Sequence, residues 1–123
     1  MKRSVLGLLI VLGFALSAVF IFSPAIFAQE DTLTIGLNLP LTGSYSDQGA
    51  DELKAYKLAI DEINAGGGLL GKRVVYVEKD SETNAQVSAK NAADLYDNYK
   101  AVMVTGGSAS SEAVAQAKVA KEK

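Results

Sequence analysis

The loop Gly106–Ser111, with the sequence GGSASS, combines glycines with short hydroxyl side chains. It follows the apolar run Ala101–Thr105 and precedes an alanine-rich segment, which we expect to be a helix from about Ser111 onward. Free N–H groups at a helix start, together with serine hydroxyls, can hold a carboxylate or a phosphate. On these residues alone, an ordinary serine N-cap is an equally good interpretation. The loop is not a P-loop, because no lysine precedes its last serine.

A second glycine motif, Gly66-x-Gly68-x-x-Gly71, matches the dinucleotide-binding fingerprint as a pattern. The fingerprint requires a strand before the glycines and a helix after them, so that the helix start meets the pyrophosphate. Here the expected order is the reverse. We therefore interpret these glycines as a helix stop followed by a tight turn.

Strands and helices alternate along the chain. The expected strands are Leu33–Leu39, Arg73–Glu78 and Ala101–Thr105, and the expected helices are Gly49–Ala65, Ala85–Tyr99 and the segment from Ser111. This alternation predicts an α/β fold with a three-layer parallel sheet and right-handed crossovers. In the first helix, an apolar face is expected from Leu53, Tyr56, Ile60 and Ile63, and the helix dipole should favour Asp51 and Glu52 in its first turn.

The flavodoxin-like strand order 2-1-3 makes the first and third strands neighbours and opens a crevice between them. The loops that follow these two strands are Pro40–Gln48 and Gly106–Ser111, which are rich in Gly, Ser and Thr. The loop with Asp80-Ser81-Glu82 follows the second strand and should lie further from the crevice. We expect its carboxylates to be solvated or capping rather than catalytic.

Composition excludes several classes of site. The chain has no cysteine, so it cannot be a lipid-anchored lipoprotein and has neither disulfides nor thiol nucleophiles. It has no histidine, which excludes His-based triads and His-rich metal sites. All 14 acidic residues follow Gln29, whereas two of the 12 basic residues precede it. The acidic remainder argues against nucleic acid as a partner. No cofactor is indicated.

Residues 1–28 have the layout of a secretory signal peptide, which we expect to be cut after Ala28. Lys2 and Arg3 form a basic start, and the apolar run Val5–Phe22 ends before Pro24. The alternative is an uncleaved membrane anchor, because the apolar run approaches spanning length. Gln29–Lys123 then forms the second part of the chain.

Four pieces of sequence carry a family resemblance. They are Leu41-Thr42-Gly43 with Gly49, Ile63-Asn64-Ala65-Gly66-Gly67 with Leu70-Gly71, Asp80, and the Gly106–Ser111 loop. In this order and spacing, the chain resembles the N-terminal part of the type I periplasmic binding proteins of ABC transporters, specifically the leucine/isoleucine/valine-binding group. The resemblance implies two α/β lobes joined by a hinge, with a ligand trapped between them. It implies transport rather than catalysis, export to the periplasm or the extracytoplasmic face of the membrane, and a membrane permease as partner.

The resemblance also implies the residues that bind the ligand. In amino-acid-binding members, a serine after the third strand binds the ligand carboxylate, and this position falls on Ser110. Ser111 and Gly107 of the same loop are expected to bind the ligand as well. Members can place an aromatic ring just before the glycine matching Gly49. This chain has Gln48 there and carries its aromatic residue earlier, at Tyr45.

Three functions are therefore weighed. The first is a solute-binding component of an importer, of which this chain would be a truncated or partial product, since the family's chains run to several hundred residues. The second is a ligand-sensing lobe of a receptor or regulator with the same fold. The third is an α/β enzyme such as an esterase or a nucleotide-binding oxidoreductase, which the lack of G-x-S-x-G, histidine and a correctly placed fingerprint disfavours.

Overall fold

The computed structural model describes residues 31–123, which form six alternating strands and helices. Their bounds are β1 Thr32–Leu39, α2 Ser46–Ala65, β2 Arg73–Asp80, α3 Ala85–Asp97, β3 Met103–Gly106 and α4 Ser110–Ala120. The three strands form one parallel sheet in the order β2-β1-β3, which confirms the predicted α/β fold and strand order. The expected signal segment 1–28 lies outside the described residues. None of the helices within residues 31–123 is long and apolar enough to cross a membrane.

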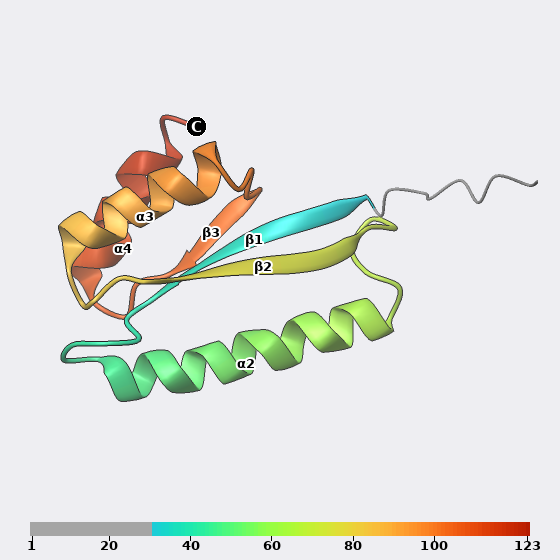
Figure 1. Cartoon of the computed structure of the whole chain (residues 1–123), viewed down its shortest axis with the longest axis horizontal. Coiled ribbons are helices and arrows are strands. Elements are labelled where there is room, and N and C mark those ends of the chain that lie inside the picture. The colour runs from blue at the N-terminus through green and yellow to red at the C-terminus, as the bar shows by residue number, and fades with distance from the viewer. Residues whose placement is uncertain (1–30) are drawn as a thin grey trace, which may run out of the picture.

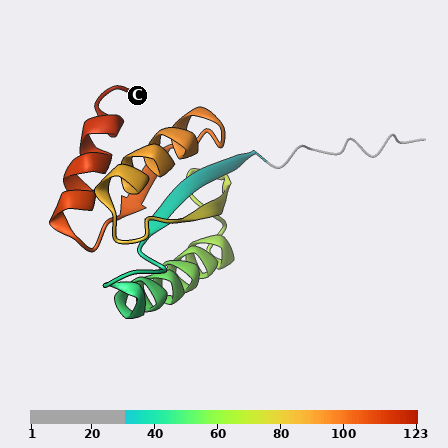
Figure 2. The ribbon, with the colours of Figure 1, turned by 60° about the vertical axis from the view of Figure 1, so that its left-hand side comes forward.

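The sheet is covered on both faces, as the alternating pattern predicts. Helix α2 lies along one face, and α3 and α4 lie together on the other (Figure 1). The turned view keeps the same three layers (Figure 2). All three strands point toward the same edge, where Leu39 pairs with Asp80 and Asn38 pairs with Gly106. The loops that follow the strands are therefore gathered at this edge, which we call the carboxyl edge.

The core forms where the apolar side chains of β1 meet the helices. Its fully or nearly fully buried members are Leu37, Leu39, Ile60, Val74, Ala92, Leu95 and Ala101. Gly36 lets α3 approach the sheet closely, because a Cβ atom there would lie 2.8 Å from Leu95 Cδ1. Burying aliphatic side chains of this kind contributes roughly 1.5–3 kcal/mol each.

Helix α2 differs in two respects from the sequence-based expectation. It begins at Ser46, three residues before Gly49, so its first turn holds Asp47 rather than Asp51 and Glu52. The expectation that the dipole favours those two residues in the first turn is therefore wrong. On the expected apolar face Ile60 is buried, whereas Ile63 keeps 38% of its surface exposed.

The glycines after α2 end the helix and turn the chain, as predicted. Gly66 is the C-cap, and Gly67 and Gly68 have φ angles of 101° and 81°, in the left-handed region that glycine tolerates. Just before them, the Asn64 side chain accepts a hydrogen bond from the Val74 N–H and donates one to the Val74 carbonyl, both at 2.8 Å. This pair of bonds attaches the end of α2 to β2.

Candidate functional site

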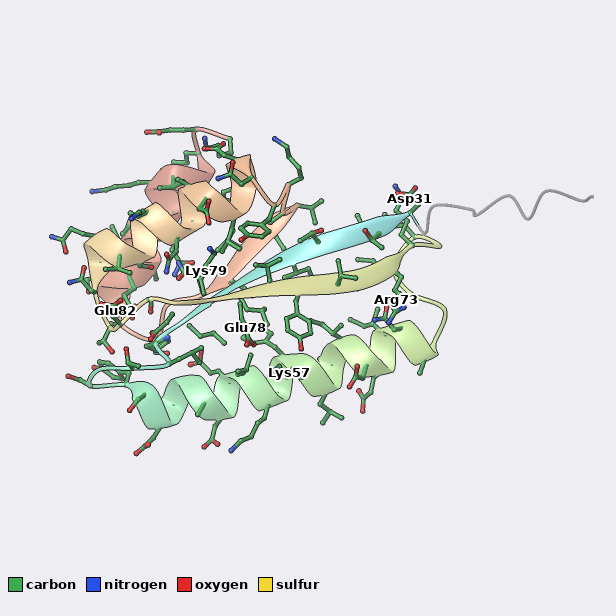
Figure 3. The ribbon with its side chains drawn as sticks, viewed as in Figure 1. Asp31, Lys57, Arg73, Glu78, Lys79 and Glu82 are labelled. Atoms are coloured by element: carbon green, nitrogen blue, oxygen red, sulfur yellow. The ribbon has the colours of Figure 1, made fainter. Side chains whose placement is uncertain are left out.

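The carboxyl edge brings the two predicted ligand loops together, because β1 and β3 are adjacent. Glu82, in the loop after β2, also lies at this edge, and Asp31 and Arg73 lie at the opposite end of the sheet (Figure 3). In the order β2-β1-β3, the loop after β2 is separated from the β3 loop by β1. The position of the expected β1/β3 crevice is therefore bordered by residues 40–45 and 107–109 and by the first turns of α2 and α4.

Helix α4 starts without a side-chain cap. Its N-cap residue is Ala109, whose methyl group cannot accept a hydrogen bond. Ser110 and Ser111, the first two residues of the helix, are exposed. Within residues 31–123, their N–H groups and hydroxyls have no acceptor, whereas Asn84 caps α3 by accepting from the N–H groups of Gln86 and Val87. The serine-cap interpretation of Gly106–Ser111 thus does not hold for the helix start, and four donors remain available.

A carboxylate already lies beneath this helix start. Glu112 is fully buried, and its Oε2 accepts a hydrogen bond from the Ala109 N–H at 3.2 Å. The other oxygen, Oε1, has no hydrogen-bond partner within the described part of the chain. Because it faces inward, Glu112 fixes the loop and leaves the outward donors of Ser110 and Ser111 free.

The two glycines of the β3 loop are required by close contacts. A Cβ atom at Gly106 would lie 2.2 Å from the Asn38 carbonyl oxygen, and one at Gly107 would lie 2.9 Å from Gln116 Nε2. Their φ angles are 120° and 85°. Gly107 therefore shapes the loop against α4, and any side chain at this position would strain it.

Tyr45 and Gln48 lie at the start of α2. Tyr45 is the N-cap residue and keeps 39% of its surface exposed, and Gln48 is exposed one turn later. The Tyr45 ring is thus accessible from the carboxyl edge. Gly49, the next residue, is buried against Pro40, whose carbonyl oxygen would lie 2.2 Å from a Cβ atom at this position.

Asp80 binds the first loop. Its Oδ1 accepts hydrogen bonds from the N–H groups of Leu41, Thr42 and Glu82, and its Oδ2 accepts one from the Thr42 hydroxyl at 2.7 Å. Burial alone would raise the pKa of Asp80, but these hydrogen bonds favour the carboxylate and together hold its pKa below the usual value. Asp80 acts as a capping carboxylate, as expected, although the groups it caps belong mainly to the β1 loop.

Helix α2 reaches the third strand and the loop after it through two side chains one turn apart. Glu52 Oε1 accepts a hydrogen bond from the Ser108 hydroxyl at 2.8 Å, and the Tyr56 and Thr105 hydroxyls lie 2.7 Å apart. These residues were not predicted as site residues. Their only sequence signal is the i, i+4 spacing of two polar groups on the face expected to be buried.

The arrangement offers hydrogen-bond donors and no metal site. Within residues 31–123, no group of three or more His, Cys, Asp or Glu side chains is placed to hold a metal ion. The available groups are the Ser110 hydroxyl, the N–H groups of Ser110 and Ser111, the exposed Tyr45 ring and the Gln48 amide, whereas the Ser111 side chain lines a hollow between α3 and α4. Such a surface can bind the carboxylate of a small molecule through charge-assisted hydrogen bonds.

Comparison with known proteins gives a consistent set of similarities. The family model described as "Periplasmic binding protein" matches residues 32–123. The branched-chain amino acid transporter substrate binding protein LivJ from Streptococcus pneumoniae, solved with isoleucine, is 34% identical, with a TM-score of 0.72 over 75% of this chain and 26% of LivJ. A solute binding protein of an ABC transporter from Rhodopseudomonas palustris BisB5, solved with 3,4-dihydroxybenzoic acid, is 29% identical, with a TM-score of 0.69 over 76% of this chain and 25% of that one.

One relative bears a different functional name. The chemotactic signal transduction system substrate-binding protein BasB of Halobacterium salinarum is 36% identical over 76 residues, which are 60% of this chain and 18% of BasB. The matching region thus spans less than a third of the length of each of these three relatives.

Proposed function

The chain belongs to the periplasmic binding protein family, and from this premise we propose that it serves as the extracytoplasmic substrate-binding component of an ABC importer for amino acids of the branched-chain type. The observation that carries the proposal is the uncapped start of α4 at the β1/β3 crevice, with the donors of Ser110 and Ser111 facing outward. The similarity to an isoleucine-bound structure supports the choice of ligand class.

In this proposal the ligand carboxylate binds at Ser110. The Ser110 hydroxyl and the N–H groups of Ser110 and Ser111 donate to its oxygens, and the positive end of the α4 dipole favours its charge. Gly107 keeps the loop close to α4, so that these donors stay at the crevice. Tyr45 and Gln48, from the other side of the crevice, contact the side chain of the ligand.

The proposed partners follow from membership of the family. A second α/β lobe encloses the ligand, and an ABC membrane permease receives it. Residues 1–28 direct export, so that Gln29–Lys123 works in the periplasm or at the extracytoplasmic face. The role is transport, and no residue of the crevice is assigned to catalysis.

The site is tested by Ser110→Ala in a two-lobed protein that carries this segment. Hydrogen bonds to charged groups contribute roughly 1.5–3 kcal/mol, so calorimetry with L-isoleucine should show affinity weakened about tenfold or more. Thr32→Ala is the matched control, because Thr32 is an exposed hydroxyl residue at the opposite end of β1. Unchanged affinity in Ser110→Ala would remove Ser110 from the ligand site.

A second candidate function is the ligand-sensing lobe of a receptor or regulator. The name of the Halobacterium salinarum relative, which places it in chemotactic signal transduction, favours this alternative. The two functions differ in the fate of Val5–Phe22. Retention of this segment as a membrane anchor favours a sensor, and cleavage after Ala28 favours the importer.

A further inference from the structure

We propose that Glu52 is a positioning residue for the candidate ligand loop, holding it from the opposite face of the sheet. The proposal rests on the proposed function, because the loop it fixes is the one that carries Ser110. The backbone of helix α2 lies close to β1 and β2, whereas among the described residues no Cα atom of α2 lies within 8 Å of one in β3, so α2 reaches β3 only through side chains. The hydrogen bonds Glu52–Ser108 and Tyr56–Thr105 therefore connect α2 to the β3 side of the crevice, and we call these four residues the α2–β3 latch.

The position of the latch gives it a specific consequence. Ser108 lies in the middle of the loop, between the left-handed Gly107 and the uncapped start of α4. On the α4 side the loop is held by Glu112, which accepts the Ala109 N–H. Glu52 holds it from the α2 side through a charge-assisted bond of 2.8 Å, which is stronger than a neutral one.

The latch also links the two walls of the crevice. Gln48 lies one turn before Glu52 on α2, so both residues fall on the same side of the helix. When Glu52 holds Ser108, the α2 residues proposed to contact the ligand side chain are fixed relative to the α4 residues proposed to bind its carboxylate. Preorganisation of this kind improves affinity by reducing the ordering that binding requires.

The test measures backbone order by ¹⁵N relaxation in the same two-lobed protein that serves for Ser110→Ala. In Glu52→Ala and in Ser108→Ala, we expect the order parameters of Gly107, Ser108 and Ala109 to fall from the rigid range of about 0.85 toward about 0.6. The double variant should show no further fall, because each single change already removes the same bond. Glu52→Gln should keep the wild-type values, since its amide oxygen can accept the Ser108 hydroxyl. Asp51→Ala is the matched control, because Asp51 is the adjacent exposed carboxylate and pairs with Lys54.

A purely structural role for Glu52 predicts a different result. It would lower the melting temperature of Glu52→Ala without a loop-specific loss of order, and this outcome would overturn the proposal. In a second experiment, L-isoleucine is titrated into the same two-lobed protein while the amide shifts of Ser110 and Ser111 are followed. We expect the shifts to be smaller in Glu52→Ala than in Glu52→Gln. If L-isoleucine shifts neither amide even in the wild type, the proposed ligand class fails, while the order parameters still decide the latch.

Discussion

Asp80 shows how a single carboxylate can organise the loop after β1, which we propose to contact the ligand. Its two oxygens accept four hydrogen bonds, three of them from the β1 loop at Leu41 and Thr42. These bonds hold the pKa of Asp80 below its usual value, despite partial burial. The folded state therefore binds fewer protons at this group than the unfolded chain does in the acid range.

The stabilising effect of Asp80 should depend on pH in one direction. It is fully present above the unfolded pKa of about 4 and is lost as the pH falls through the lower folded pKa. We predict that Asp80→Asn lowers the free energy of unfolding by about 1–2 kcal/mol at neutral pH, because a neutral amide accepts weaker bonds. The difference from the wild type should shrink in acid.

Urea unfolding of a two-lobed protein that carries this segment, at several pH values, measures this effect. Asp61→Asn is the matched control, since Asp61 is an exposed carboxylate on α2. A difference between Asp80→Asn and the wild type that stays constant from neutral pH into strong acid would contradict the assigned role of Asp80.

At the same scale, the sequence allows Ser110 and Gly107 to be proposed as ligand-loop residues, but it does not connect Glu52 with that loop. Runs of Gly and Ser between a strand and a helix have few uses, so their chemistry can be inferred locally. The partner of Glu52 is Ser108, 56 residues away, and only the packed positions of α2 and β3 bring the two together. The sequence alone therefore predicts that Glu52 is an acidic residue of the first helical turn, stabilised by the helix dipole. In the tertiary structure Glu52 instead accepts a hydrogen bond from Ser108.

Among the elements, α2 begins earlier than the sequence predicts, because Gly49 lies inside the helix and not at its start. The segment Pro40–Gln48 is dense in turn residues, so the sequence predicts a helix that starts at about Gly49. In the structure Gly49 is helical and buried, and a Cβ atom there would meet the Pro40 carbonyl oxygen at 2.2 Å. Close packing between helix and loop, which cannot be inferred from local propensity, is the reason for glycine at this position.

We predict that Gly49→Ala destabilises the fold, although alanine favours helices by about 1 kcal/mol over glycine. The added methyl group must push the start of α2 away from Pro40, and overpacking of this kind typically costs about 1–3 kcal/mol. Thermal unfolding of the two-lobed protein that carries this segment, followed by circular dichroism, measures the change.

The matched control for Gly49→Ala is Gly66→Ala, at the other end of the same helix. Gly66 has an ordinary φ of −79°, and a Cβ atom there would lie 3.4 Å from its nearest neighbour, the Ile63 carbonyl oxygen. We expect Gly66→Ala to change stability by no more than a few tenths of a kcal/mol. Equal stability of the two variants would contradict the packing argument.

For the whole molecule, the export proposal makes a prediction about the first 28 residues. We predict that the exported product begins at Gln29, because Lys2, Arg3 and the apolar run Val5–Phe22 match a secretory signal that ends in a small residue at Ala28. N-terminal sequencing of the product secreted from a bacterial host measures the cleavage site. A chain that keeps Met1 and sediments with membranes would favour the sensor function instead.

The open edge of the sheet underlies the last prediction. Strand β3 pairs with β1 on one side, and among residues 31–123 no strand pairs with its other side. Next to this edge, Val102 and Met103 keep 61% and 46% of their surfaces exposed. An unpaired apolar edge favours association with other chains. We therefore predict that purified Gln29–Lys123 unfolds at low temperature and aggregates.

The same chain should not bind an amino acid with useful affinity, because the described residues form only one wall of a pocket. Ligand sites usually bury most of the ligand surface, whereas a zwitterion on an open wall stays hydrated and exchanges bonds with water for bonds of similar strength. Binding would also have to contribute free energy to folding. Thermal melts of Gln29–Lys123 with and without a panel of amino acids test both expectations. A cooperative melt that one amino acid raises by several degrees would show that this wall forms a sufficient site alone or between copies.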